Sequence, residues 1–230
     1  MVDWADPPLS MISKRTGVSV NATVATQLSD LPGTDVEEAQ IVNANGIEWN
    51  DSFDVIVVGL GAAGVSAAIE AADQGCRVAF IDRFNGGGTT ARSGSVMYAG
   101  GGTALQKKLG IEDDPENMFR YLQHEVKDAV TPQTLRKFCE DSPGNYNWVL
   151  GNGVRYSGNL FPKKTSYPTP GHSLYYSGNE IAYASSAKAA PRGHLADGIK
   201  RFTAFGPAFV GPLIKSAYKK LAIKCHPDKN

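Results

Sequence analysis

Residues 53–82 read FDVIVVGLGAAGVSAAIEAADQGCRVAFID, and this stretch decides the fold. Val55–Val58 are four β-branched residues in a row, which predicts a parallel strand buried on both faces. An alanine-rich run over residues 62–73 follows, and Gly75 provides a stop, so we predict a helix there. A second strand is predicted over residues 77–81. Strand, glycine turn, helix and strand is the order of a Rossmann-like α/β unit with a parallel sheet flanked by helices.

The glycines and one acid of this stretch predict a dinucleotide site. Gly59 and Gly61 permit a sharp turn and a close approach of the backbone to a pyrophosphate, and Gly64 lets the helix lie close to the strand. The helix N-terminus would face the phosphates with its free N–H groups. Asp82 comes about 20 residues after the turn, where a carboxylate accepts from the ribose hydroxyls and disfavours a cofactor with a 2′-phosphate.

Two simpler interpretations compete with nucleotide binding. The first is a glycine-rich loop that holds no ligand. The second is a membrane span over residues 55–69, which is too short for a bilayer, rich in glycine and flanked by Asp54 and Glu70. The glycine spacing within a strand–turn–helix–strand–acid order favours the nucleotide.

The composition is that of a globular protein and limits the classes of partner. The 230 residues are 42% hydrophobic and 20% charged, and the formal net charge is +0, so we expect neither a nucleic-acid surface nor an anionic-membrane surface. Cys76, Cys139 and Cys225 are widely spaced and form no Cys-x-x-Cys pair, which favours a reducing compartment and predicts no metal site. The N-terminal residues lack a secretory signal pattern, so we expect a cytoplasmic location.

A second glycine-rich stretch follows Asp82 directly: residues 83–95 read RFNGGGTTARSGS. Gly-Gly-Thr-Thr followed by Ser-Gly resembles the second flavin-contact loop of FAD-dependent oxidoreductases, in particular soluble fumarate reductases and 3-ketosteroid dehydrogenases. The resemblance implies FAD as cofactor, with Ser-Gly near the isoalloxazine ring; a solvated glycine turn is the simpler alternative. The predicted cofactor-binding residues are Gly59, Gly61, Ala62, Ala63, Gly64, Asp82, Arg83, Thr89, Thr90, Ser93 and Gly94.

Residues 113–151 predict two helices of an outer layer. Asp113-Asp114-Pro115 and Thr131-Pro132 are helix starts, and Leu135, Phe138 and Cys139 are expected on one face.

Downstream, LYYSGNE (residues 174–180) and APRGH (residues 190–194) again resemble the ketosteroid-dehydrogenase-like members, where this region leads to the substrate-capping domain. Tyr167, Tyr176 and Arg192 are the candidate catalytic residues, as proton donors or as a clamp for a carbonyl or carboxylate. Alternatively, the tyrosines only cover the core. The resemblance implies a small-molecule substrate of the steroid-like or dicarboxylate class.

The C-terminal stretch LIKSAYKKLAIKCHPDKN (residues 213–230) resembles the second helix and loop of a J-domain co-chaperone. That resemblance implies a DnaK-type chaperone as partner, contacted by the basic helix and by His226, Pro227 and Asp228. A chance basic amphipathic helix is the alternative. No J-domain first helix precedes it, so we expect its apolar stripe, Ile214, Tyr218, Leu221 and Ala222, to find little of its native J-domain partner to pack against.

These patterns divide the chain into a loosely structured lead-in (1–50), an FAD-binding domain with the start of a capping region (51–197), and a linker with a J-domain-like helix (198–230). Flavoproteins of the family are much longer, so we expect a truncated or fused, possibly inactive form with an unpaired sheet edge and weak FAD retention. The leading functional hypothesis is hydride transfer between substrate and flavin. The alternatives are a non-enzymatic chaperone-interacting protein and an NAD-dependent dehydrogenase, and the Gly-Gly-Thr-Thr loop counts against the latter.

Overall fold

The computed structural model describes residue 47 and residues 51–198 and 205–224. Contacts within the chain separate residues 1–53 from residues 54–230, and every helix and strand named below belongs to the second unit. The predicted lead-in over residues 1–50 therefore lies almost wholly outside the described residues.

The first elements of this unit are strand β1 (Val55–Val58), helix α2 (Ala62–Asp73) and strand β2 (Val78–Ile81). β1 and β2 pair in parallel, with Val55 opposite Val78 and Val58 opposite Ile81. The predicted first strand and helix are confirmed to the residue, and the second strand starts one residue later than predicted. Gly75 has a φ of +96°, a conformation that glycine adopts without strain and that ends the helical path.

The side chains on one face of this small sheet are exposed. Val57 is 8% exposed, whereas Ile56 is 58% and Val58 80% exposed. The prediction that β1 is buried on both faces is therefore wrong. Alternate strand residues point to opposite faces, and α2 covers only the face that carries Val57.

A second, four-stranded sheet contains the rest of the strands in the described residues, in the order β3-β6-β5-β4. β6 pairs antiparallel with β3 and β5, and β4 pairs parallel with β5. The bounds are β3 (Val96–Tyr98), β4 (Asn159–Lys164), β5 (His172–Tyr176) and β6 (Gly193–Leu195). The 3-10 helix η3 (Gly88–Arg92) precedes β3 and joins the two sheets in sequence.

Three helices lie between β3 and β4 in sequence: α3 (Ala104–Lys108), α4 (Pro115–Val126) and α5 (Pro132–Gly151). Both predicted helix starts are confirmed, because the Asp114 carboxylate accepts from the Asn117 N–H at 2.7 Å and the Thr131 hydroxyl accepts from the Thr134 N–H at 3.3 Å. The predicted apolar face of α5 is partly wrong, since Phe138 is 43% exposed.

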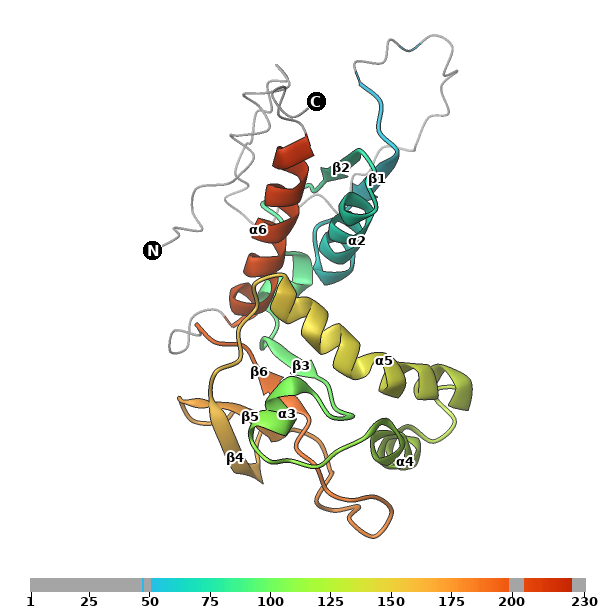
Figure 1. Ribbon diagram of the computed structural model, residues 1–230, viewed down its shortest axis with the longest axis vertical. Helices are drawn as coiled ribbons and strands as arrows, with labels where there is room; N and C mark the ends of the chain where they lie inside the picture. Colours follow the sequence, from blue (N-terminus) through green and yellow to red (C-terminus); the bar gives the residue numbers. More distant parts are fainter. Residues whose placement is uncertain (1–46, 48–50, 199–204, 225–230) are drawn as a thin grey trace, which may run out of the picture. The chain divides into compact units, whose positions relative to one another are not determined.

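Helix α6 (Gly206–Lys224) packs beside α2 and η3 (Figure 1). Its residues Val210, Leu213, Ile214 and Ala217 are at most 5% exposed and belong to the main apolar core. Three residues of the predicted stripe, Ile214, Tyr218 and Leu221, pack against apolar residues of this chain, which take the place of the J-domain partner. None of the helices in the described ranges is long and apolar enough to cross a bilayer.

Candidate functional site

The first glycine turn (residues 59–64) joins β1 to α2 through close backbone contacts. Gly59 has a φ of +90° and donates its N–H to the Ile81 carbonyl at 2.7 Å. A Cβ at Gly64 would lie only 1.8 Å from the Gly59 carbonyl oxygen. The helix therefore approaches the strand end as closely as a backbone without side chains allows, as the sequence predicted for Gly64.

The N-terminus of α2 is open to a ligand from outside the helix. Gly61 is the N-cap and has no side chain to accept from the helix N–H groups, and the first turn contains no acid. The Ala62 N–H donates to the Thr90 hydroxyl oxygen at 3.1 Å. A 12-residue helix whose first turn contains no acid suits an anionic group such as a pyrophosphate.

Asp82 sits at the end of β2 and shapes the same turn. One of its carboxylate oxygens accepts the Leu60 N–H at 2.6 Å and the other accepts the Phe84 N–H at 2.8 Å. Each oxygen retains a further lone pair, so ribose hydroxyls can still donate to this half-buried carboxylate. Arg83 is exposed, and its guanidinium carbon lies 4.8 Å from the centre of the Phe84 ring.

The second glycine loop (residues 86–95) lies directly against the first turn. Gly87 donates its N–H to the Leu60 carbonyl at 2.7 Å, and a Cβ at Gly88 would lie 3.3 Å from Gly61 Cα. Thr89 and Ser93 are exposed, and the Ser93 hydroxyl donates to the Thr90 carbonyl at 2.8 Å. The structure thus brings together the two glycine segments that the sequence assigned to one cofactor.

Of the three candidate catalytic residues, Tyr167 contacts this loop. A Cβ at Gly94 would lie 2.1 Å from the Tyr167 hydroxyl oxygen, and the Tyr167 ring stacks on Phe205 with centroids 5.1 Å apart. Tyr167 remains 48% exposed. Tyr176 is half-buried at the end of β5, and burial raises the pKa of its hydroxyl.

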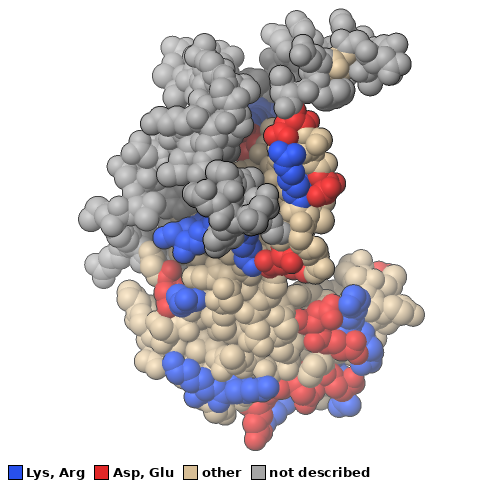
Figure 2. Space-filling view, turned by 45° about the horizontal axis from the view of Figure 1, so that its top comes forward, with Lys and Arg blue, Asp and Glu red and all other residues tan. Residues whose placement is uncertain are grey.

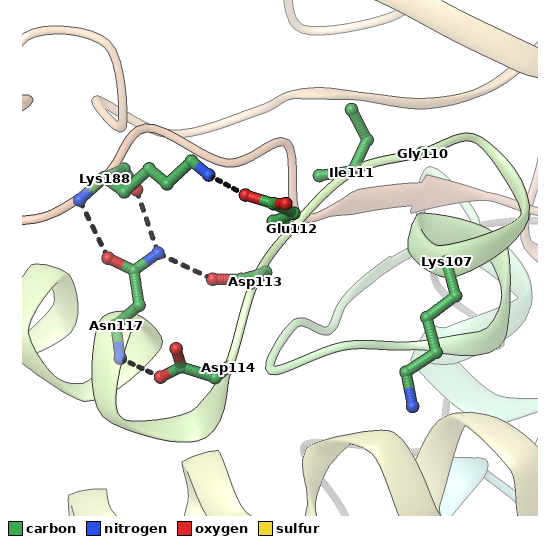
Figure 3. Close-up of a pocket in the computed structure, with 8 residues that line it drawn as sticks. All are labelled: Lys107, Gly110, Ile111, Glu112, Asp113, Asp114, Asn117 and Lys188. Carbon is green, nitrogen blue, oxygen red and sulfur yellow. Dashed lines mark hydrogen bonds and ion pairs between the residues drawn. The ribbon is translucent and has the colours of Figure 1, made fainter.

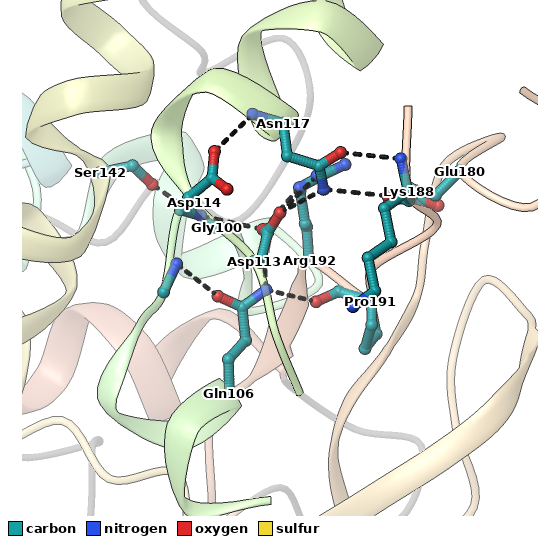
Figure 4. Close-up of polar contacts among 12 residues, drawn as sticks. Gly100, Gln106, Asp113, Asp114, Asn117, Ser142, Glu180, Lys188, Pro191 and Arg192 are labelled. Atoms are coloured by element: carbon teal, nitrogen blue, oxygen red, sulfur yellow. Dashed lines mark hydrogen bonds and ion pairs between the residues drawn. The ribbon is translucent and has the colours of Figure 1, made fainter. Parts of the chain in front are cut away.

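Arg192 is fully buried in an ion pair that the sequence did not reveal (Figure 4). Its Nε and Nη2 donate to the two oxygens of Asp113 at 3.0 and 2.8 Å. Burial raises the pKa of the Asp113 carboxyl, but the bonds and charge of Arg192, together with bonds from Asn117 and Gly101, more than offset this, and the pKa lies below its ordinary value. A substrate cannot reach a guanidinium with 0% side-chain exposure, so a clamping role for Arg192 does not fit this structure.

Two other buried polar residues lie near this ion pair. Glu180 is 1% exposed and accepts from the Tyr98 hydroxyl at 3.2 Å, and burial raises the pKa of its carboxyl. His194 lies between the Arg192 carbonyl and the Thr103 hydroxyl, each 3.0 Å from a ring nitrogen. Since a carbonyl only accepts, the Nδ1 of His194 carries the proton, and burial lowers the pKa of the ring to about 4.

A cavity of about 560 Å³ opens elsewhere, between α3, the start of α4 and Lys188 (Figure 3). Most of its charged groups already have partners: Lys188 pairs with Glu112, Asp114 caps α4, and Asp113 binds Arg192. No residue of either glycine segment lines it. This cavity is therefore separate from the two glycine segments.

On the face drawn in Figure 2, acidic and basic side chains of the described residues are interspersed. The three predicted chaperone-contact residues, His226, Pro227 and Asp228, lie outside the described residues.

Comparison with known proteins identifies the class of this chain. A family model described as "FAD binding domain" matches residues 54–227. The chain therefore belongs to the FAD binding domain family, and FAD is the cofactor of that domain. The match runs past residue 198 and through α6.

Two named relatives show which FAD-binding proteins this chain is similar to. The chain is 44% identical over 163 residues to a 3-oxo-5-alpha-steroid 4-dehydrogenase of Comamonas testosteroni, covering 69% of this chain and 31% of the relative. It is 35% identical over 104 residues to an NADH:fumarate oxidoreductase of Klebsiella pneumoniae, covering 45% of this chain and 11% of that protein.

A solved structure of a ketosteroid dehydrogenase is also similar to this chain. The 3-ketosteroid-delta4-(5alpha)-dehydrogenase of Rhodococcus jostii, in complex with 4-androstene-3,17-dione, matches with a TM-score of 0.71 and 36% identity. The match covers 77% of this chain and 38% of the Rhodococcus chain. The chain thus spans about a third of the length of these two steroid dehydrogenases.

Proposed function

We propose that this chain provides the FAD-binding part of an oxidoreductase that moves a hydride between a substrate carbon and the flavin. The observation that carries the proposal is the meeting of the first glycine turn, Asp82 and the second glycine loop at one end of the β1–β2 sheet. Bound FAD supplies a two-electron acceptor and donor at N5 of its ring.

Each part of the site has a role that follows from its chemistry. The open N-terminus of α2 holds the pyrophosphate, and the carboxylate of Asp82 accepts from the adenosine ribose. The hydroxyls of Thr89 and Thr90 donate to phosphate or ribityl oxygens, and Ser93 and Gly94 lie along the ring.

Tyr167 is the best-placed residue to manage a proton. Its hydroxyl reaches Gly94, which the proposal places at the flavin ring, and half of its surface is open to a substrate. We assign the substrate to the steroid ketones, because the 44%-identical Comamonas relative is named for a 3-oxo-5-alpha-steroid. A dicarboxylate, for which the Klebsiella relative is named, is the other outcome of a substrate screen.

The site assignment is tested by titrating the protein with FAD and following flavin fluorescence. Asp82→Asn is expected to weaken FAD binding about tenfold, the effect of losing one charge-assisted hydrogen bond. Asp128→Asn, an exposed carboxylate beyond the end of α4, is the matched control and is expected to bind like the wild type. Equal affinities for the two variants would contradict the proposed site.

A chaperone contact through α6 is a second candidate function. Lys215 and Lys219 are exposed while the opposite, apolar side of α6 is buried, so positive charge is available on the outer side of this helix. A pull-down with a DnaK-type chaperone tests the idea, and capture must be lost in His226→Gln. Capture that persists in that variant would rule out the J-domain mode.

A further inference from the structure

We infer that Arg192 and Asp113 are positioning residues for the flavin end of the cofactor site. Their buried ion pair holds the strand that leaves the second glycine loop, so it controls how that loop meets the flavin. This inference rests on the proposed function and names two residues, far apart in sequence, on which the site depends.

The link to the loop is a continuous backbone ladder. β3 begins one residue after the second glycine loop, and Val96 and Tyr98 pair with Leu195 and Gly193 of β6. The ladder is extended at both ends: Ala99 donates its N–H to the Arg192 carbonyl at 3.0 Å, and Ala196 donates to the Ser95 carbonyl at 3.3 Å. A shift of Arg192 therefore shifts the C-terminal end of the loop.

The side chain of Arg192 fixes the other end of β3. A Cβ at Gly100 would lie 2.7 Å from Arg192 Cδ, so the arginine stem lies directly against the backbone of the turn that follows β3. The next residue, Gly101, donates its N–H to Asp113 at 2.9 Å. Both members of the ion pair thus contact the same short turn.

The carboxylate of Asp113 is saturated with donors (Figure 4). Besides Gly101 and the two bonds from Arg192, it accepts from the amide of Gln106 at 3.1 Å and from that of Asn117 at 2.7 Å. Five donors, from the residue before β6, from α3, from α4 and from the turn after β3, hold this carboxylate in place.

Arg192 also has an unused donor. Its Nη1 is buried without a hydrogen-bond partner among the described residues. The charge of Arg192 also lowers the pKa of the nearby Glu180 carboxyl. That carboxyl accepts from the hydroxyl of Tyr98, the last residue of β3. The guanidinium is therefore held by Asp113, and removing that carboxylate leaves a buried cation free to turn towards Glu180. Such a turn would move β3.

FAD offers a direct test because its two halves contact different segments. The ADP half occupies the first glycine turn and Asp82, and the flavin half reaches the end of the second glycine loop. A disturbed ion pair should therefore weaken FAD and spare ADP. A general loss of structure would weaken both ligands together.

The experiment measures dissociation constants for FAD and for ADP by calorimetry on the same protein preparations. Asp113→Asn and Arg192→Lys are expected to weaken FAD about tenfold, since neither retains the bidentate charged pair, and to change ADP less than about twofold. Asp82→Asn is the matched control and is expected to weaken both ligands. Tyr98→Phe removes only one hydroxyl and is the smallest change in the series. It is expected to weaken FAD binding about threefold and to leave ADP binding unchanged.

The outcomes separate the two proposals. Equal losses for FAD and ADP in the ion-pair variants, or no loss of either, would overturn the positioning role. A wild-type protein that binds neither ligand would overturn the proposed function and this inference with it. Wild-type binding of both ligands, with a loss confined to FAD, is the expected result.

Discussion

The two glycine segments and the buried network around Arg192 use polar groups in opposite ways. In the glycine segments, side chains are small or absent, and the first turn of α2 contains no acid. Around Arg192, charged side chains turn inwards and bond to one another and to the backbone, and among the described residues only Nη1 of Arg192 is buried without a partner. The difference teaches that the proposed FAD site combines backbone groups with a few polar side chains such as Asp82, while the buried charges hold the scaffold.

The largest expected effect comes from adding one methyl group to the glycine turn. In Gly64→Ala, the new Cβ would collide with the Gly59 carbonyl oxygen at 1.8 Å, so α2 must move away from β1. We expect a loss of about 4 kcal/mol in unfolding free energy and no detectable FAD binding. Chemical denaturation and a fluorescence titration measure the two effects.

The matched control is a helical glycine with open space around it. A Cβ at Gly144 in α5 would meet nothing within 4 Å, and alanine is the better helix former. Gly144→Ala should gain up to about 1 kcal/mol and bind FAD normally. If both variants lose the same stability, the close approach at Gly64 is not the cause.

The second prediction concerns the buried network around Arg192 and the pH dependence of its stability. His194 is neutral when folded, with a pKa of about 4, whereas an unfolded histidine has a pKa of about 6.5 and takes up the proton first. The neutral form of His194 therefore stabilises the folded protein above pH 6.5. About 3 kcal/mol of unfolding free energy is lost as the pH falls towards 4. Unfolding free energies of the wild type at several pH values across this range measure the loss.

The His194→Gln variant isolates the pH-dependent contribution of His194 to the unfolding free energy. Glutamine can also donate to one neighbour and accept from the other, but it does not titrate. The wild type should lose stability relative to this variant as the pH falls. Parallel curves for the two proteins would show that His194 is not buried in its neutral form.

A smaller effect of opposite sign is expected at Glu180. Burial raises the pKa of this carboxyl, so its stabilising contribution is present below its ordinary pKa and is lost as the pH rises through the folded value. Glu180→Gln should therefore be more stable than the wild type at neutral pH, and the difference should disappear in acid. Thermal unfolding at pH 4 and pH 7 compares the two proteins, and a variant less stable at both pH values would refute the assignment.

The smallest effect is expected on the exposed face of the β1–β2 sheet. Val58 is 80% exposed, so Val58→Thr should change the unfolding free energy by less than about 0.5 kcal/mol. Its neighbour Val57 is 8% exposed, and Val57→Thr buries a hydroxyl at a cost of about 1–3 kcal/mol. Similar losses in denaturant titrations of the two variants would mean that both faces are buried.

The glycine region was predictable because its signals are local. Strand, turn, helix and acid follow one another within residues 53–82, and each residue type has one conformational reason to be there. The prediction that β1 is buried on both faces failed, because four β-branched residues fit a strand with one or two covered faces equally well.

The buried network was not predictable, because its members are distant in sequence. Asp113 lies 79 residues from Arg192, and its local context indicated a helix start, which in the structure is capped by its neighbour Asp114. Arg192 was interpreted as a clamp on a substrate because an arginine beside tyrosines has no local sign of burial. The carboxylate and the guanidinium meet only in the folded chain, where the residue before β6 reaches the segment between α3 and α4.

The most direct test of the account is an absorption spectrum of the purified chain after incubation with an equimolar mixture of FAD and NAD and removal of free ligand. The length of the chain led us to expect weak FAD retention, but the meeting of the two glycine segments and Asp82 predicts that flavin bands remain with the wild type and disappear in Gly64→Ala. A wild-type protein that is colourless after desalting, or that retains only the nicotinamide dinucleotide, would contradict the assignment of these segments to FAD.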